Sequence, residues 1–333
     1  MLYLWIFLII VGFAMLIKGA DWFVEGAAGI AGKCHISALV IGLTVVAFGT
    51  SAPELAVSIT SAVQHSTDIS IGNVVGSNIV NILLILGLSA LIHQLPVQKS
   101  SMLLDIPVLI LASALLVGLG VWGNALSWWD GLILLAVFAG YMVLLFRNAR
   151  KEQRELLARG GDVQPAEKKE PKGKISTWVA KMEEKTWFLV VLTLIGLGLV
   201  VGGGTLLVDG ARYVASYFGV SERIIGLTVV ALGTSLPELV TSVVAASKGE
   251  TDIAVGNLIG SNIFNIFLVA GAASLFYPLT FTLSGNLVDA LVALGAAILL
   301  YALAWLGKKR LGKVAGAVMV LCFIGYYVYL FIV

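Results

Sequence analysis

The sequence has few charged residues. Asp, Glu, Lys and Arg together make up 12% of its 333 residues, whereas hydrophobic residues make up 59%. Soluble globular domains are about a quarter charged, so this composition excludes that class. It indicates an all-α polytopic membrane protein, because long apolar segments cross a bilayer as helices.

Residues that bind soft metals are equally scarce. The chain has two cysteines, Cys34 and Cys322, and three histidines, His35, His65 and His93. The cysteines are far apart and show no metal-ligand spacing, and the histidines fall at the ends of apolar segments. This scarcity argues against a zinc or copper site. We also find no nucleophile–base pair, so we expect neither an enzyme nor a resident cofactor.

Ten apolar segments are long enough to cross a bilayer as helices. Five lie on each side of the polar stretch 148–185, which we interpret as a linker between a first repeat, 1–147, and a second repeat, 186–333. Because five is odd, the second repeat must enter the membrane from the opposite side, so the sequence predicts two inverted five-helix repeats. The predicted spans are 2–30, 37–63, 69–92, 102–122, 126–147, 187–216, 221–246, 252–276, 286–306 and 312–332.

Basic residues are distributed unevenly along the chain. Counted with Arg147 at its edge, the linker holds 11 of the 21 Lys and Arg residues, and seven more fall on the same side of the membrane, so 18 of 21 lie there. Cytoplasmic loops carry such an excess. We therefore expect a multi-pass protein of the cell inner membrane, with a cytoplasmic linker and both termini outside.

A long segment of the chain occurs twice. Between Ser37 and Gly87, 29 of 51 residues are identical to the residue 184 positions later. Each copy places one carboxylate, Glu54 or Glu238, within an apolar segment. A carboxylate at membrane depth is costly and marks a candidate functional site. In an inverted repeat, the two copies supply the two walls of one ion site.

Each of these glutamates ends a Gly-Thr-Ser-x-Pro-Glu motif, at 49–54 and at 233–238. Proline inside a helix frees the carbonyl four residues earlier, so the second and seventh spans should be broken helices whose open backbone lines a site. Every candidate ligand beside the break is an oxygen, which suits hard cations such as Na⁺, Ca²⁺ and Mg²⁺. These ligands are Thr50, Ser51 and Glu54 in the first copy and Thr234, Ser235 and Glu238 in the second.

A second motif follows each break. GNVVGSNIVN at 72–81 and GNLIGSNIFN at 256–265 carry a polar residue at every fourth position, which makes one polar stripe along a helix. Such a stripe must face protein or water. We expect the two stripes to complete an oxygen cage with the broken helices; interhelical hydrogen bonding without an ion is the alternative. The stripes are Asn73, Ser77 and Asn81, and Asn257, Ser261 and Asn265.

Two ionised glutamates would give the site a charge of −2, which one Ca²⁺ or two Na⁺ would neutralise. Protons are a third candidate, because neighbouring carboxylates disfavour one another's ionised form.

The remaining acids within spans have simpler interpretations. Asp105 and Asp289 lie near the starts of spans, where the helix dipole favours an acid. Lys18, Asp21 and Glu25 share one face of the first span, and we expect them to form a salt-linked cluster.

The two motif pairs resemble the α-repeats of the cation/Ca²⁺ exchanger superfamily, and most closely those of prokaryotic Na⁺/Ca²⁺ exchangers. The resemblance implies a core of spans two, three, seven and eight, with spans one and six sliding across it to alternate access. It also implies the ligands of Na⁺ and Ca²⁺: Glu54, Glu238, Thr50, Ser51, Thr234, Ser235, Ser77, Asn81, Ser261 and Asn265, and the backbone carbonyls of Ala47 and Ala231.

Asn265 departs from several of these relatives. K⁺-dependent exchangers carry Asp at this position, and an amide keeps the oxygen while removing a titratable charge. The resemblance therefore implies no co-transport of K⁺. The Thr-Ser pair of each motif also differs from the Ca²⁺/H⁺ branch, where Asn is common, and this favours Na⁺ as the driving ion.

Our leading interpretation is a secondary antiporter that exchanges Na⁺ for Ca²⁺, with net charge movement if more than two Na⁺ enter per Ca²⁺. A Ca²⁺/H⁺ antiporter on the same fold is the alternative. A cation channel is disfavoured, because an inverted pair of repeats predicts alternating access. We expect a monomer whose partners are these ions and the lipid bilayer, without nucleic acid.

Overall fold

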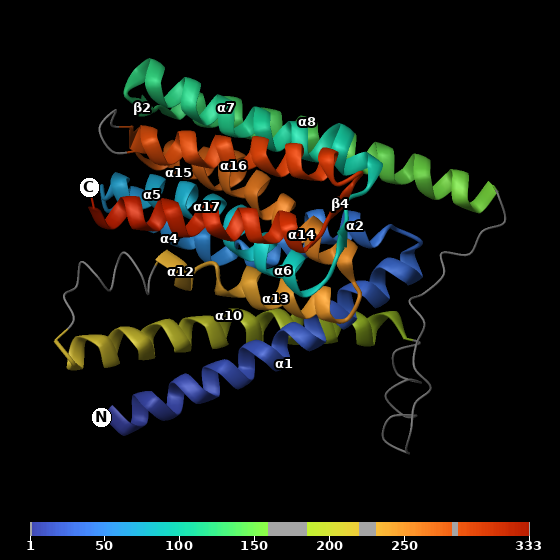
Figure 1. Ribbon diagram of the computed structural model, residues 1–333, viewed down its shortest axis with the longest axis horizontal. Coiled ribbons are helices and arrows are strands. Elements are labelled where there is room, and N and C mark those ends of the chain that lie inside the picture. Colours follow the sequence, from blue (N-terminus) through green and yellow to red (C-terminus); the bar gives the residue numbers. More distant parts are fainter. Residues whose placement is uncertain (1, 159–184, 220–230, 282–285, 333) are drawn as a thin grey trace.

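The computed structural model describes residues 2–158, 185–219, 231–281 and 286–332. Helices dominate these residues, and Figure 1 shows most of them running along one common direction. By length and hydropathy, eight helices of the described ranges can cross a membrane, and a bent pair adds a ninth. This confirms a helical polytopic membrane protein. The predicted span 221–246 includes residues outside the described ranges, so the count of ten stays a prediction.

The described helices fall within or overlap the predicted spans, and four two-residue strands that we did not predict lie between them. The first half contains α1 (Leu2–Cys34), α2 (Ala38–Ile41), the π-helical segment η1 (Gly42–Val46), α3 (Ala47–Thr50), α4 (Ala52–Val63), α5 (Thr67–Ile79), η2 (Val80–Leu86), α6 (Gly87–Ile92), β1 (Leu95–Pro96), η3 (Ser101–Asp105), α7 (Ile106–Gly123), β2 (Ala125–Leu126) and α8 (Trp128–Ala158). Helix α8 therefore continues into the segment that we interpreted as a linker.

The second half repeats this order. It contains α10 (Thr186–Tyr217), α12 (Ala231–Gly233), α13 (Leu236–Ser247), α14 (Thr251–Phe264), η5 (Asn265–Ala270), α15 (Gly271–Phe276), β3 (Leu279–Thr280), α16 (Asn286–Leu306), β4 (Arg310–Leu311) and α17 (Lys313–Ile332). The start of α1 and the end of α17 lie at the same end of the bundle (Figure 1).

The predicted helix breaks are present. Helices α3 and α4 meet at Ser51 with a bend of 45°. Ser51 has φ −84° and ψ 5°, and Ser235, which precedes α13, has φ −87° and ψ 5°. Pro53 and Pro237 each follow in the first turn of the next helix, where a missing N–H costs nothing. The two breaks therefore share one backbone geometry.

The centre of the molecule consists of the helices that carry the polar stripes. In the segments Thr67–Ile92 and Thr251–Phe276, 72% and 94% of the most apolar window is buried, against 17% in α1. Polar residues within membrane spans almost always face the protein interior, and this burial places both stripes against other protein segments rather than lipid.

Two short antiparallel β pairings join the two halves of the chain. Strand β1 pairs with β4 through Leu95 and Leu311, and β2 pairs with β3 through Ala125 and Thr280. Each pairing takes one strand from each half. Strand β3 lies 184 residues after β1, so the two pairings follow the sequence repeat.

Helices α1 and α10 form a close pair at one edge of the molecule (Figure 1). Glycines allow this approach: a Cβ at Gly19 would lie 2.9 Å from the Gly196 carbonyl oxygen, and a Cβ at Gly196 would lie 2.5 Å from the Phe23 nitrogen. Small residues that let backbones approach are the usual basis of helix pairing in lipid. The pair therefore packs as one unit.

Candidate functional site

Four broken or π-distorted helices meet at the centre of the described structure. Glu54 and Glu238 are completely buried there, although each begins an otherwise apolar helix. The other side chains that we predicted as ligands gather around them. Thr50, Ser51, Ser77, Asn81, Ser235, Ser261 and Asn265 are also buried, and Thr234 is half-buried.

The carboxylates of the two repeats are held by each other's serines. Ser51 Oγ donates to Glu238 Oε1 at 3.0 Å, and Ser235 Oγ donates to Glu54 Oε1 at 3.5 Å. Each serine stands at the break of one repeat and bonds the glutamate of the other. The two breaks therefore build one site between the repeats rather than one site each.

Several buried oxygens of this cluster have no hydrogen-bond partner among the described residues. They are Glu54 Oε2, Glu238 Oε2, Ser77 Oγ, Asn81 Oδ1 and Asn265 Oδ1. Leaving a buried acceptor unsatisfied costs roughly 1–3 kcal/mol, and more for a charged group. A hard cation takes carboxylate, hydroxyl and amide oxygens of this kind. The donor set therefore fits Ca²⁺ or Na⁺ bound as substrate.

Asn81 and Asn265 occupy π-helical segments, which the sequence reasoning did not foresee. Asn81 lies in η2, and Asn265 begins η5 exactly one repeat length later. A π-helical turn inside an α-helix is rare and occurs often at functional sites, because it re-aims side chains. The two asparagines match each other in the sequence repeat and give no local sign of a π-helix. The π-helical turns are therefore evident only in the backbone of the structure.

The backbone oxygens beside the first break are partly engaged. The Ala47 carbonyl accepts the Ser51 N–H at 3.0 Å and lies 3.4 Å from Thr50 Oγ1. A carbonyl has two lone pairs, so these contacts do not prevent a contact with a cation. Ser261 Oγ lies 3.4 Å from Thr50 Oγ1. Ala231 is the first residue of α12, at the edge of a described range.

Asp105 and Asp289 contact tyrosines on the next helix. Tyr141 Oη donates to Asp105 Oδ1 at 3.0 Å, and Tyr326 Oη donates to Asp289 Oδ1 at 2.8 Å. Our helix-dipole interpretation missed these partners, which lie 36 and 37 residues later in the chain. The two acids thus tie η3 to α8 and α16 to α17.

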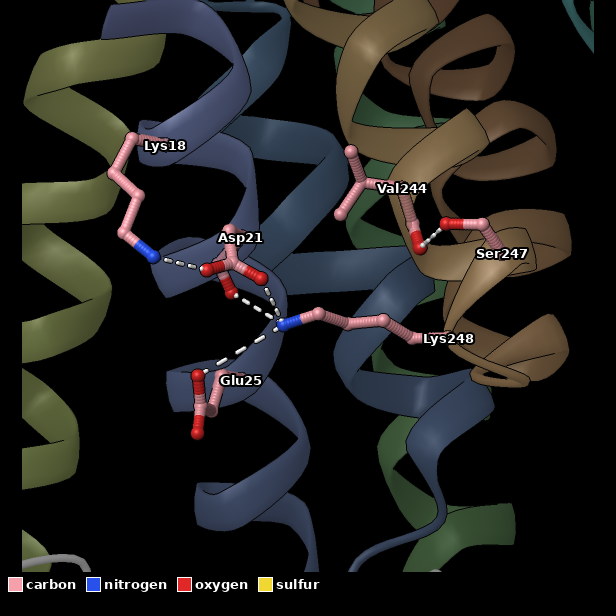
Figure 2. A network of polar contacts seen from close by, with 6 residues as sticks. All are labelled: Lys18, Asp21, Glu25, Val244, Ser247 and Lys248. Carbon is pink, nitrogen blue, oxygen red and sulfur yellow. Dashed lines mark hydrogen bonds and ion pairs between the residues drawn. The ribbon is translucent and has the colours of Figure 1, made fainter. Parts of the chain in front are cut away.

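A network of charges breaks the symmetry of the repeats (Figure 2). Lys248, just after α13, forms ion pairs with Asp21 and Glu25 of α1, and its ammonium also donates to the Asp21 carbonyl at 3.1 Å. Lys18 Nζ lies 2.6 Å from Asp21 Oδ2. The salt-linked cluster that we predicted on α1 is present, and Lys248 extends it to the core. The residue 184 positions before Lys248 is the neutral Gln64.

Comparison with known proteins agrees with this geometry. The family model described as "Sodium/calcium exchanger protein" matches residues 4–147 and 188–332. This chain belongs to that family. The exchanger is 34% identical to the solved sodium-calcium exchanger NCX_Mj soaked with Na⁺ and Ca²⁺, with a TM-score of 0.81 over 97% of each chain.

Two curated relatives have similar full-length matches. The exchanger is 34% identical to "Sodium/calcium exchanger MaX1" of Methanosarcina acetivorans, over 82% of this chain and 83% of that one. It is also 34% identical to "Inner membrane protein YrbG" of Escherichia coli, over 94% of this chain and 92% of that one.

Proposed function

We propose that this exchanger is a secondary antiporter that moves Ca²⁺ against Na⁺ through the site between Glu54 and Glu238. The observation that carries the proposal is the set of buried oxygens that find no hydrogen-bond partner within the described ranges, around two cross-bonded carboxylates. The set contains two acids and otherwise neutral oxygens. That composition suits an ion that exchanges rather than one that stays, because fewer ligand charges weaken a hard-cation site.

The charge of the site sets the coupling. With both glutamates ionised, one Ca²⁺ or two Na⁺ neutralise the pair, and a site without cations keeps two buried charges at a cost of several kcal/mol. Passage without a bound ion is therefore disfavoured, which is what obligatory exchange requires. Transport becomes electrogenic when a third Na⁺ enters per Ca²⁺.

The proposed ligands are the side chains predicted from the motifs. Glu54 and Glu238 bind both ions, and backbone carbonyls from Ala47 and Ala231 cap the outer and inner Na⁺ sites. The remaining oxygens come from Thr50, Ser51, Thr234, Ser235, Ser77, Asn81, Ser261 and Asn265. Since Asn265 is an amide, no third acid requires an additional cation, and we propose transport that is independent of K⁺.

The alternative function is Ca²⁺/H⁺ antiport on the same fold. Two buried glutamates could carry protons as well as Na⁺. The hydroxyls of Ser51 and Ser235, which contact these carboxylates, favour Na⁺ because they offer oxygen ligands to an ion that has no hydrogen to donate.

The proposed architecture has ten spans in two inverted repeats. Both termini lie outside and the segment 148–185 lies in the cytoplasm. Most of the basic residues fall on this cytoplasmic side of the membrane. Helices α1 and α10 would slide together across the core to alternate access, and their close pairing supports movement as one unit. We propose that the monomer suffices.

Reconstituted protein tests the function. Proteoliposomes loaded with Na⁺ should take up ⁴⁵Ca²⁺ when diluted into Na⁺-free buffer, with or without K⁺. Glu54→Gln and Glu238→Gln should each abolish uptake, whereas the matched control Glu250→Gln, outside the site, should not. Uptake that follows a proton gradient and ignores Na⁺ would favour the alternative.

A further inference from the structure

A chain of hydrogen bonds runs from Thr50 into the opposite repeat. Thr50 Oγ1 donates to Asn257 Oδ1 at 3.0 Å, and Asn257 Nδ2 donates to Ser242 Oγ at 2.9 Å. All three side chains are buried. Ser242 stands one helical turn after Glu238, so the chain links the helix that carries one glutamate to the break of the other repeat.

The same chain recurs from Thr234. Thr234 Oγ1 donates to Asn73 Oδ1 at 3.3 Å, and Asn73 Nδ2 donates to Ser58 Oγ at 2.9 Å. Asn73 Nδ2 also lies 3.2 Å from the Glu54 carbonyl oxygen. Ser58 stands one turn after Glu54. Each residue of this hydrogen-bond chain lies 184 positions from the corresponding residue of the other. The sequence repeat therefore duplicates the whole hydrogen-bond chain.

These contacts fix the direction of each threonine hydroxyl. An amide offers donors on one side and an acceptor on the other. Because the Asn257 NH₂ group faces Ser242, its oxygen faces Thr50. That oxygen is the nearer acceptor for the Thr50 hydrogen, at 3.0 Å against 3.4 Å for the Ala47 carbonyl. The lone pairs of Thr50 Oγ1 then stay available as ligands for a cation. Without Asn257, the hydrogen could rotate toward the cation position and oppose binding.

We propose that Asn257 and Asn73 are positioning residues, which hold Thr50 and Thr234 with their lone pairs directed at the cation. The proposal rests on the proposed function, since it assigns the threonines as cation ligands. Partners that orient the ligands of a metal typically contribute 10–100-fold to its affinity. Asn257 has the shorter threonine contact and should contribute more than Asn73.

A double-mutant cycle on the full chain in detergent tests this role, with equilibrium ⁴⁵Ca²⁺ binding as the readout. Asn257→Leu should raise the Ca²⁺ concentration for half-saturation about tenfold. In a Thr50→Val background, where no hydroxyl needs orienting, the same substitution should change half-saturation by less than about twofold.

Asn78→Leu is the matched control for lost packing. Asn78 is a buried asparagine on α5 whose Nδ2 donates to the Asn262 carbonyl at 3.3 Å, and within the described ranges it has no hydrogen bond to a threonine. This variant should lower the melting temperature and leave half-saturation unchanged. An equal effect of Asn257→Leu in both backgrounds, or no effect in either, would overturn the positioning role while the proposed function stands. A wild-type protein that binds no Ca²⁺ would overturn both.

Discussion

Lys248→Gln should release α1 from the core, because it removes the charge that pairs with the acids of α1. The substitution gives the second repeat the residue that the first repeat already carries at Gln64. Lys248 joins α13 to Asp21 and Glu25 of α1, and these side chains are about one-third exposed (32%, 30% and 40%). Partly exposed ion pairs contribute about 0.2–1 kcal/mol each, and the hydrogen bond to the Asp21 carbonyl adds about 1 kcal/mol.

These contributions sum to about 1.4–3 kcal/mol, which shifts an equilibrium about 10- to 150-fold. If α1 slides during alternating access, the network stabilises only the state in which Lys248 reaches Asp21. The opposite state has no equivalent ion-pair network, because Gln64, the counterpart of Lys248 in the first repeat, is neutral. The substitution should therefore move the population toward the state in which α1 is displaced from α13.

Distances between spin labels measure this shift. One label is placed on Cys34, at the end of α1, and a second on Lys99→Cys near the start of η3, with Cys322→Ala removing the other cysteine. The ratio of the two distance populations should change about 10- to 150-fold in Lys248→Gln. Lys313→Gln, an exposed lysine at the start of α17, is the control. A change below about twofold would refute the reasoning.

Three further predictions concern the site and the α1–α10 pair. Ser51→Ala should weaken ⁴⁵Ca²⁺ binding more than Ser235→Ala, because Ser51 Oγ lies 3.0 Å from the Glu238 carboxylate and Ser235 Oγ lies 3.5 Å from that of Glu54. Equal losses of binding would argue against different contributions of the two serines. Asn265→Asp adds a third buried acid, so Ca²⁺ uptake should become dependent on pH or K⁺, and an unchanged profile in vesicles would contradict this. Gly196→Ala should slow exchange and lower the free energy of unfolding by about 1–3 kcal/mol through overpacking, with a lower melting temperature as the readout. Gly198→Ala, with open space at its Cβ, should do neither; similar behaviour of the two variants would count against close pairing.

The helix breaks could be predicted from the sequence because proline acts locally. Pro53 and Pro237 lack the N–H that a continuous helix needs, and the helix is interrupted at the serine shortly before each of them. The cross-repeat contact of Ser51 with Glu238 follows less directly: the inverted repeat places the two motifs together, but the partner of each hydroxyl depends on tertiary packing.

Other features had no local signal. The π-helical segments at Asn81 and Asn265 depend on how the interior helices pack, because nothing in the residues themselves forbids an ordinary α-helix there. The tyrosine partner of Asp105 lies on another helix, and the helix dipole offered a sufficient local explanation without it. In the sequence, Lys248 is one more basic residue at the end of a span. Its ion pair with Asp21 depends on the packing of α1 beside α13, which no local signal predicts.

Two repeats that build one cation site, with a charge of −2 from Glu54 and Glu238, should bind one Ca²⁺ per chain. Equilibrium ⁴⁵Ca²⁺ binding to the purified chain measures this number. We expect one Ca²⁺ per chain at saturation, and complete loss of that binding in Glu54→Gln and equally in Glu238→Gln. Two Ca²⁺ per chain, with one retained in each variant, would contradict it, because each repeat would then hold a site of its own.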